Sequence, residues 1–228
     1  MISMKKSVFK FLPGLFSIGL LILFSASCSR VTDYNTVHLE SKTQKCEATL
    51  DYPQFTSGKL SEFNKVLAQQ ETVYYNIIDE YSDFWDEMHS IYENSEEELD
   101  EELILPYYYD VKSEVTSSGS MISVIFYYES YSGGAHGLHY IDSITWDVNK
   151  NRQLSIEEAS GLTTEEISRK CIEELKELIP DGGWIEEGAG IDAVSSMKFS
   201  CDKDKIFVHF SPYDVAAYVY GAFTVEIK

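Results

Sequence analysis

Residues 131–137, Tyr-Ser-Gly-Gly-Ala-His-Gly, constrain the fold of this chain more than any other stretch. Apolar residues alternate along 121–128 before it, and a second alternating run follows at 143–148, so the stretch connects two predicted strands. Glycine reaches positive φ and lets backbones approach closely because it has no Cβ. Three glycines in five residues therefore predict a connection of defined shape.

The N-terminus predicts export. Three lysines in the first ten residues precede an apolar run at 11–24, which is shorter than the roughly 20 residues of a membrane-spanning helix. Small residues at 25–27 then precede Cys28, as in a lipobox. We expect residues 1–27 to be a lipoprotein signal peptide and Cys28 to be lipidated in the cell envelope. The alternative is a cleaved signal followed by an incidental cysteine.

The chain is acidic, with a formal net charge of −20. Loss of residues 1–27 would remove three lysines and no acid, which gives −23. Such a surface repels nucleic acid and attracts basic proteins or cations, although acidity also simply keeps a protein in solution. We expect no nucleic-acid partner.

Residues 28–43 lack periodicity and are expected to tether the domain of residues 44–228 to the membrane. Apolar residues at three- and four-residue spacing predict a long helix over 58–93, and a capping box at Thr163 predicts a shorter helix over 164–179. Another capping box at Ser155 predicts one helical turn. Strands are predicted at 48–52, 104–116, 121–129, 143–148, 194–201, 206–211 and 223–227.

This order of elements predicts an α+β fold. A mostly antiparallel sheet of about six or seven strands would pack against one long and one shorter helix. We divide the domain into an N-terminal part, 44–130, and a C-terminal part, 131–228. Seven carboxylates within 93–102 lack the spacing and the turn glycine of a Ca²⁺ loop, so they are interpreted as a solvated helix end that begins again at a capping box at Ser95.

Cysteines and histidines yield no metal or catalytic site. Export permits disulfides, but the sequence does not select a pair among Cys46, Cys171 and Cys201. His136 and His139 lie close together, yet residues three apart on a strand point to opposite faces and no third ligand is indicated. We expect the His136 ring nitrogens to tie the glycine loop to backbone carbonyls or to a neighbouring Asp. No catalytic motif occurs, so we expect no catalytic residue, no cofactor and no enzyme.

Two segments carry a family resemblance. Residues 131–137 resemble the Tyr-Ser/Thr-Gly-Gly-Ala-His-Gly signature of a bacterial cell-envelope family of unknown function, and Tyr213–Gly221 resembles its closing Tyr-x-x-x-x-Tyr-x-x-Gly segment. Ala217 stands where that family often has Pro. The family includes the lysozyme-sensing ectodomain of the anti-sigma factor RsiV and the N-terminal part of the deacetylase PdaC. The resemblance extends from about Cys46 to the C-terminus.

These features favour a lipid-anchored envelope protein that binds a protein partner, such as the basic protein lysozyme. A peptidoglycan- or glycan-binding module is the alternative, and an envelope hydrolase is the third reading. Exposed tyrosines are common recognition side chains, and the chain has sixteen tyrosines. The residues expected to bind the partner are Tyr131, Ser132, Gly133, Gly134, His136, Gly137 and Tyr140.

The lipid anchor can be tested by replacing Cys28. Two or more acyl chains, at about 0.8 kcal/mol per buried CH₂, hold a protein firmly on a membrane. The wild type should therefore sediment with membranes, whereas Cys28→Ser should incorporate no labelled lipid. A wild-type protein recovered in the soluble fraction would show that the anchor is absent.

Overall fold

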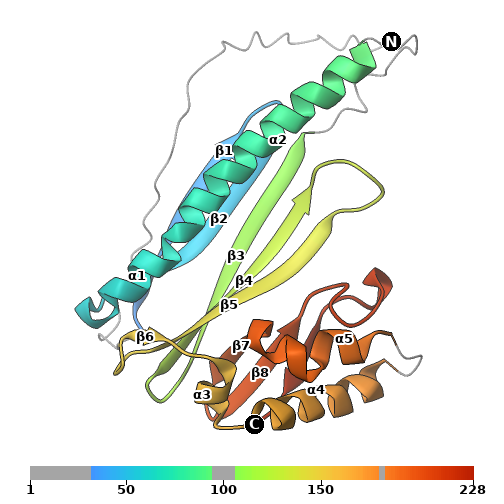
Figure 1. Cartoon of the computed structure of the whole chain (residues 1–228). Coiled ribbons are helices and arrows are strands. Elements are labelled where there is room, and N and C mark those ends of the chain that lie inside the picture. The colour runs from blue at the N-terminus through green and yellow to red at the C-terminus, as the bar shows by residue number, and fades with distance from the viewer. Residues whose placement is uncertain (1–31, 94–105, 180–182) are drawn as a thin grey trace, which may run out of the picture.

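The computed structural model describes residues 32–93, 106–179 and 183–228 (Figure 1). The expected signal peptide, Cys28, the capping box at Ser95 and nearly all of the acidic run 93–102 lie outside the described residues. Within the described ranges, no helix has both the length and the apolarity to cross a membrane.

A six-stranded sheet forms the N-terminal half, with the strand order β1-β2-β3-β4-β5-β6. Neighbouring strands are antiparallel except for β2 and β3, which run parallel. A parallel pair requires a crossover connection, and the long helical segment between β2 and β3 supplies it. The strands are β1 (Tyr34–Lys42), β2 (Cys46–Phe55), β3 (Tyr107–Ser118), β4 (Met121–Tyr131), β5 (Leu138–Asp147) and β6 (Arg152–Gln153).

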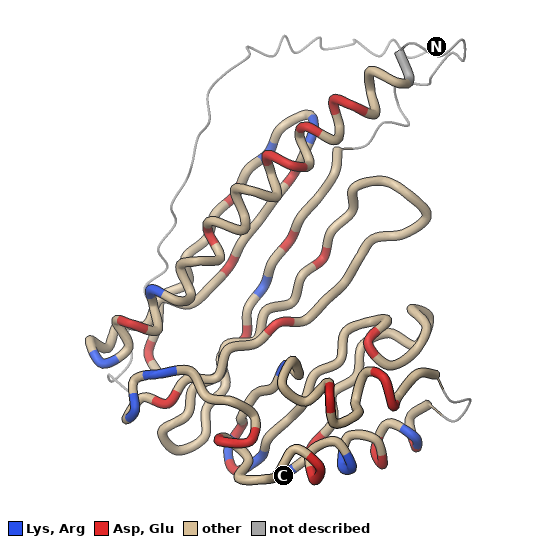
Figure 2. Tube along the Cα trace, viewed as in Figure 1, with Lys and Arg blue, Asp and Glu red and all other residues tan. Residues whose placement is uncertain are grey.

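The helical segment begins with a 3₁₀ turn at Gly58–Leu60 and continues as α1 (Ser61–Leu67) and α2 (Gln69–Glu93). Ala68, between them, keeps right-handed helical backbone angles, so the expected long helix is confirmed. Along α2 there is neither Lys nor Arg, and its outward face is acidic (Figure 2).

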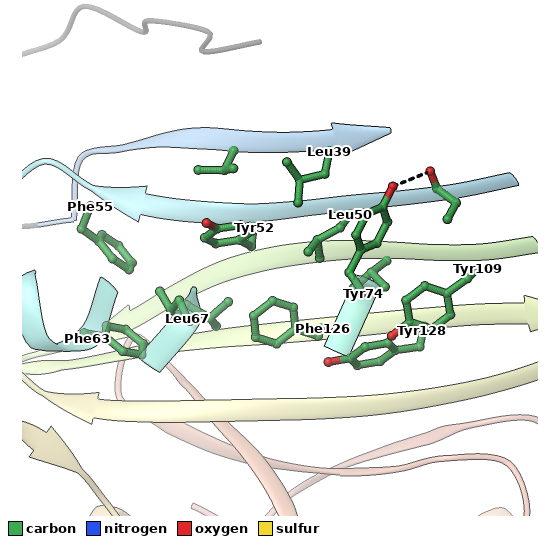
Figure 3. Packing of buried hydrophobic residues seen from close by; sticks show 14 of the residues in the cluster. Leu39, Leu50, Tyr52, Phe55, Phe63, Leu67, Tyr74, Tyr109, Phe126 and Tyr128 are labelled. Atoms are coloured by element: carbon green, nitrogen blue, oxygen red, sulfur yellow. Dashed lines mark hydrogen bonds between the residues drawn. The ribbon is translucent and has the colours of Figure 1, made fainter. Parts of the chain in front are cut away.

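The first half of this helical segment builds the main core. Phe63, Leu67 and Tyr74 are fully buried and point toward the strands (Figure 3). The Tyr74 hydroxyl donates a hydrogen bond to the Ala48 carbonyl of β2 (3.0 Å). The expected apolar stripe does not stay buried along its whole length, because the end of α2 extends past the strands (Figure 1) and Ile91 is 55% exposed.

The C-terminal half has its own sheet and its own core. Strands β7 (Lys198–Asp202), β8 (Lys205–Phe210) and β9 (Phe223–Glu226) form an antiparallel sheet in the order β7-β8-β9. It packs with α3 (Ile156–Ser160), α4 (Thr164–Leu178), α5 (Ile185–Ala189) and a 3₁₀ helix at Ile191–Ser196. A 3₁₀ turn at Tyr218–Tyr220 precedes β9.

Both capping boxes predicted in this half are confirmed. The Ser155 and Thr163 side chains accept hydrogen bonds from the backbone N–H groups of Glu158 and Glu166, and the two glutamates bond back to the cap residues. Cys171 is fully buried in the second core, as its helical spacing predicted. Cys46, Cys171 and Cys201 are free thiols, and burial raises the pKa of Cys46 to about 11.

The α+β class is confirmed, but the strands divide between two sheets. Two expected boundaries are wrong. Most of the expected tether, residues 28–43, is the strand β1, which buries Val37 and Leu39 against β2. The division at residues 130 and 131 cuts the hairpin of β4 and β5. Because hairpin pairing keeps β5 in the first sheet, the second core begins only near Leu154.

A chain of buried hydroxyl groups joins the two sheets. The Cys201 N–H of β7 donates to Ser123 Oγ of β4 (2.9 Å), and Ser123 Oγ lies 2.7 Å from Thr145 Oγ1 of β5. The Thr145 hydroxyl then donates to the Phe199 carbonyl of β7 (3.1 Å). These side chains give hydrogen-bond partners to the Cys201 N–H and the Phe199 carbonyl at the edge of β7. Burial of these backbone groups without partners would cost free energy.

Acid should destabilise the C-terminal sheet through His209 on β8. This ring is buried between Ser200 Oγ (2.9 Å) and Thr224 Oγ1 (3.2 Å), and burial lowers its pKa to about 4. The ring is neutral in the folded state, so its contribution to stability is complete above about pH 6.5, the unfolded pKa, and is lost as the pH falls toward the folded pKa.

We expect the free energy of unfolding to fall by about 2 kcal/mol between about pH 7 and pH 5 because of this residue. Urea denaturation at the two pH values measures it. His209→Gln should lose this part of the pH dependence, whereas His38→Gln, at a half-buried position on β1, should keep it. An unchanged pH dependence in His209→Gln would contradict the assignment.

Candidate functional site

The three loop glycines serve two purposes. Gly133 and Gly134 have φ of +98° and +95°, which only glycine adopts readily. Gly137 instead permits close approach, because a Cβ there would lie 2.9 Å from the Ser130 carbonyl oxygen and 3.0 Å from the Tyr108 hydroxyl. The Tyr131 hydroxyl donates to the Gly134 carbonyl (3.1 Å). The loop therefore has a defined shape, as its composition predicted.

His136 connects this loop to a distant part of the chain. Its Nδ1–H donates to the Gly137 carbonyl (2.8 Å), which is the kind of contact expected from the sequence. Its ring also stacks on Tyr218, with ring centroids 4.3 Å apart and an interplanar angle of 19°. The Tyr218 hydroxyl donates to the same Gly137 carbonyl (3.0 Å). The two segments that carry the family resemblance thus meet in space.

Tyr213 occupies a strained turn beside this contact. Its φ is +75°, which is unusual for a bulky side chain, and its side chain is 49% exposed. The Trp184 indole N–H donates to the Tyr213 carbonyl (2.8 Å), and the Trp184 backbone N–H donates to Val215 (3.0 Å). The surrounding hydrogen bonds therefore hold the strained conformation, a pattern that is concentrated at functional sites.

The packing of α5 reinforces that turn. Gly188, in α5, lies flush against the Asp214 backbone, and a Cβ there would collide with the Asp214 carbonyl oxygen. The Asp214 carboxylate accepts from the Ser211 N–H (2.6 Å). The sequence did not identify Trp184 and Gly188 as site residues, because no local pattern predicts their contacts with the turn at Tyr213 and Asp214.

We define the aromatic surface as His136, His139, Trp184, Tyr213 and Tyr218. The Tyr218 ring lies at its centre, with centroid distances of 5.4 Å to Tyr213 and 6.1 Å to His139. Exposed apolar residues adjoin it, and these are Leu138 and Val219. Contiguous exposed apolar groups on a soluble domain mark interaction sites.

The open face of the six-stranded sheet continues from the aromatic surface. Tyr131 stacks on Tyr108 of the neighbouring strand, with ring centroids 6.1 Å apart. Glu129, two residues earlier on β4 and hence on the same face, lies 3.6 Å from His139 Nδ1. Tyr108 is exposed, so this end of the sheet face is not covered by the C-terminal half.

Tyr140 was expected beside Tyr131 and His136, and that grouping is wrong. Tyr140 stacks on Tyr128 of β4, with ring centroids 4.0 Å apart, and Tyr128 belongs to the core beneath α2. Successive residues of a strand point to opposite faces, so Tyr140 leaves the face of its neighbour His139. Ser132 lies half-buried at the start of the loop.

The arrangement offers contact area and hydrogen bonding. Among the described residues, no group of three or more His, Cys, Asp or Glu side chains is placed to hold a metal ion. His136 bonds to a carbonyl and His139 pairs with Glu129, so each ring already has a partner. Rigid aromatic rings at a fixed distance from one another are suited to recognition.

Two family models match adjacent parts of the chain. Residues 39–139 match the model described as Deacetylase PdaC, and residues 155–228 match a protein family of unknown function, DUF3298. His136 and His139 lie in the first matched segment, and Trp184, Tyr213 and Tyr218 lie in the second. No curated protein matches the chain in sequence.

Solved structures share the fold. A DUF3298 family member from Bacteroides fragilis NCTC 9343 matches with a TM-score of 0.60 and 18% identity, over 85% of this chain and 89% of that one. A DUF3298 family protein from Pseudomonas aeruginosa PAO1 matches with a TM-score of 0.52 and 14% identity, over 86% of this chain and 91% of that one.

The shape of the glycine loop can be tested at Gly134. An L-residue at its φ of +95° is strained even though a Cβ would meet open space, so Gly134→Ala should lower the free energy of unfolding by about 1–2 kcal/mol. Gly58→Ala is the matched control, because that site is open and its φ is not positive. Urea denaturation compares the two variants. Equal stability would show that the loop does not require its observed backbone.

Proposed function

We propose that this chain, which matches a PdaC model at 39–139 and a DUF3298 model at 155–228, is a lipid-anchored binding protein of the cell envelope. The small residues before Cys28 support the anchor. It recognises a protein partner through the aromatic surface. The observation that carries this proposal is that neither segment forms the surface alone. The loop supplies His136 and the C-terminal segment supplies Tyr213 and Tyr218. The His136–Tyr218 stack and the hydrogen bond from Tyr218 to the Gly137 carbonyl hold the two segments together.

The position of the surface relative to the proposed anchor supports this function. β1 begins at Tyr34, so six Cα–Cα steps from Cys28 reach at most about 22 Å. Tyr34 pairs with Phe55 at one end of the sheet, whereas Lys42, Cys46, Tyr107 and Tyr131 lie at the other end, beside the glycine loop (Figure 1). With the anchor at Cys28, the aromatic surface lies at the end of the sheet farther from the attachment point, where a partner can reach it.

Charge favours a basic partner. Without residues 1–27 the formal net charge is 15 − 38 = −23, which speeds encounter with a positively charged protein, and this effect weakens with salt. The resemblance to the lysozyme-sensing RsiV ectodomain points to a basic protein such as lysozyme. The proposal is one of binding without catalysis, although one matching family model carries the name of a deacetylase. Aromatic rings also stack on sugars, so a soluble peptidoglycan fragment is a second ligand to test.

Titration with lysozyme tests the proposal. Binding should persist between about 50 and 300 mM salt, a range over which the Debye length shortens by more than twofold and purely electrostatic attachment is largely screened. Tyr218→Ala removes the central ring and should weaken lysozyme binding about tenfold, which corresponds to about 1.4 kcal/mol. Tyr75→Ala, at an exposed tyrosine on α2, is the matched control and should bind like the wild type.

An unrelated basic protein of similar charge and a peptidoglycan fragment are titrated in parallel. Equal weak binding to both basic proteins, abolished at the higher salt concentration, would show that no specific partner of this kind exists. Binding of the peptidoglycan fragment alone, lost in Tyr218→Ala, would instead assign the surface to glycan recognition.

A further inference from the structure

The surroundings of the aromatic surface are poor in positive charge. No Lys or Arg occurs within residues 113–149, 177–197 or 206–227, and these three segments supply every residue of the surface. Figure 2 shows the same absence along the loop that joins β4 and β5. In a chain with eighteen Lys and Arg residues, the described segments that form the aromatic surface therefore bring no cationic side chain of their own to it.

Lysines that flank two of these segments pair with acids. Lys198 lies 2.9 Å from Asp142, and Lys112 lies 2.8 Å from Asp110. A carboxylate does lie within these segments, because Glu129 on β4 has a side chain that is 55% exposed.

The rings are placed to receive a cation. Tyr213 is half exposed in a turn that hydrogen bonds hold rigid, and the exposed Trp184 is bonded to the Tyr213 carbonyl. An ammonium or guanidinium group is attracted to the face of an aromatic ring. A guanidinium group also stacks flat on such rings and forms paired hydrogen bonds with a carboxylate, which an ammonium group cannot do.

We infer that the aromatic surface is a receptor for an arginine side chain of the partner, which stacks on the rings of Tyr213 and Tyr218 while Glu129 accepts hydrogen bonds from the guanidinium group or its neighbours. This inference rests on the proposed binding function and names the chemical group that the surface selects. The hydroxyls of a neutral sugar could donate hydrogen bonds to the carboxylate but would gain no charge pairing, whereas an arginine gains both hydrogen bonds and charge pairing.

Matched peptides test the inference without a protein partner. The probe is acetyl-Gly-Arg-Gly-Arg-Gly-amide, and its control carries citrulline, which has nearly the same shape and no charge, in place of arginine. A third peptide carries lysine. Binding is followed by the ¹H–¹⁵N resonance of the Trp184 indole N–H, which Trp184→Phe identifies. The indoles of Trp85 and Trp146, both buried, serve as internal references.

The arginine peptide should shift the Trp184 resonance saturably and bind at least threefold more tightly than the citrulline peptide. The lysine peptide should bind between the two. Tyr213→Ala should reduce the affinity for the arginine peptide to that for the citrulline peptide. Glu129→Gln should weaken binding about threefold, whereas Glu173→Gln, at an exposed acid on α4, should leave it unchanged and thereby separates local recognition from net charge.

Equal binding of the arginine and citrulline peptides would overturn the inference, as would the absence of a saturable shift or equal effects of the two Glu→Gln variants. These outcomes are distinct from failure of the proposed function. If lysozyme binds in a Tyr218-dependent way and the arginine peptide does not, the surface recognises its partner by other chemistry. If the peptide binds and neither basic protein does, the arginine site exists and the proposed class of partner is wrong.

Discussion

The structure depends on the buried hydroxyl chain between its two sheets. Ser123 and Thr145 on the first sheet bond to the backbone of Cys201 and Phe199 on β7. Without these hydroxyls, the edge of β7 would be buried against another sheet with unpaired polar groups, which would oppose docking of the two halves. Because hydrogen bonds are directional, the chain fixes the position of β7 along β4 and β5, which purely apolar contact would leave less specified.

That fixed position determines what lies at the other end of the strands. The Ile141 N–H of β5 donates to Ser211 Oγ (2.9 Å), just before the turn that contains Tyr213. Farther along, Tyr218 reaches the glycine loop and bonds to the Gly137 carbonyl. The aromatic surface is therefore a consequence of how the two sheets dock. We therefore expect a substitution of Ser123 or Thr145 to displace the aromatic surface, although neither residue belongs to that surface.

The aromatic surface also contains backbone strain, which lowers the free energy of unfolding. Tyr213, at φ +75°, has a conformation that local preference disfavours, and the surrounding hydrogen bonds maintain it. These hydrogen bonds hold the exposed rings in one arrangement, so a partner does not have to order them on binding. The proposed recognition of a cationic side chain uses this rigidity together with the absence of local Lys and Arg.

The sequence by itself determined the structural features that depend only on residues close together in the chain. The glycine loop, the long helix, the strands β4 and β5 and the capping boxes at Ser155 and Thr163 are all specified within a few positions of the chain. Only the tertiary structure decided the rest. The addition of β1 to the sheet, the split into two sheets and the placement of Tyr140 on the opposite face depend on pairing and register. The stacking of His136 on Tyr218, 82 positions later, depends on docking between sheets, which no periodicity in the sequence records.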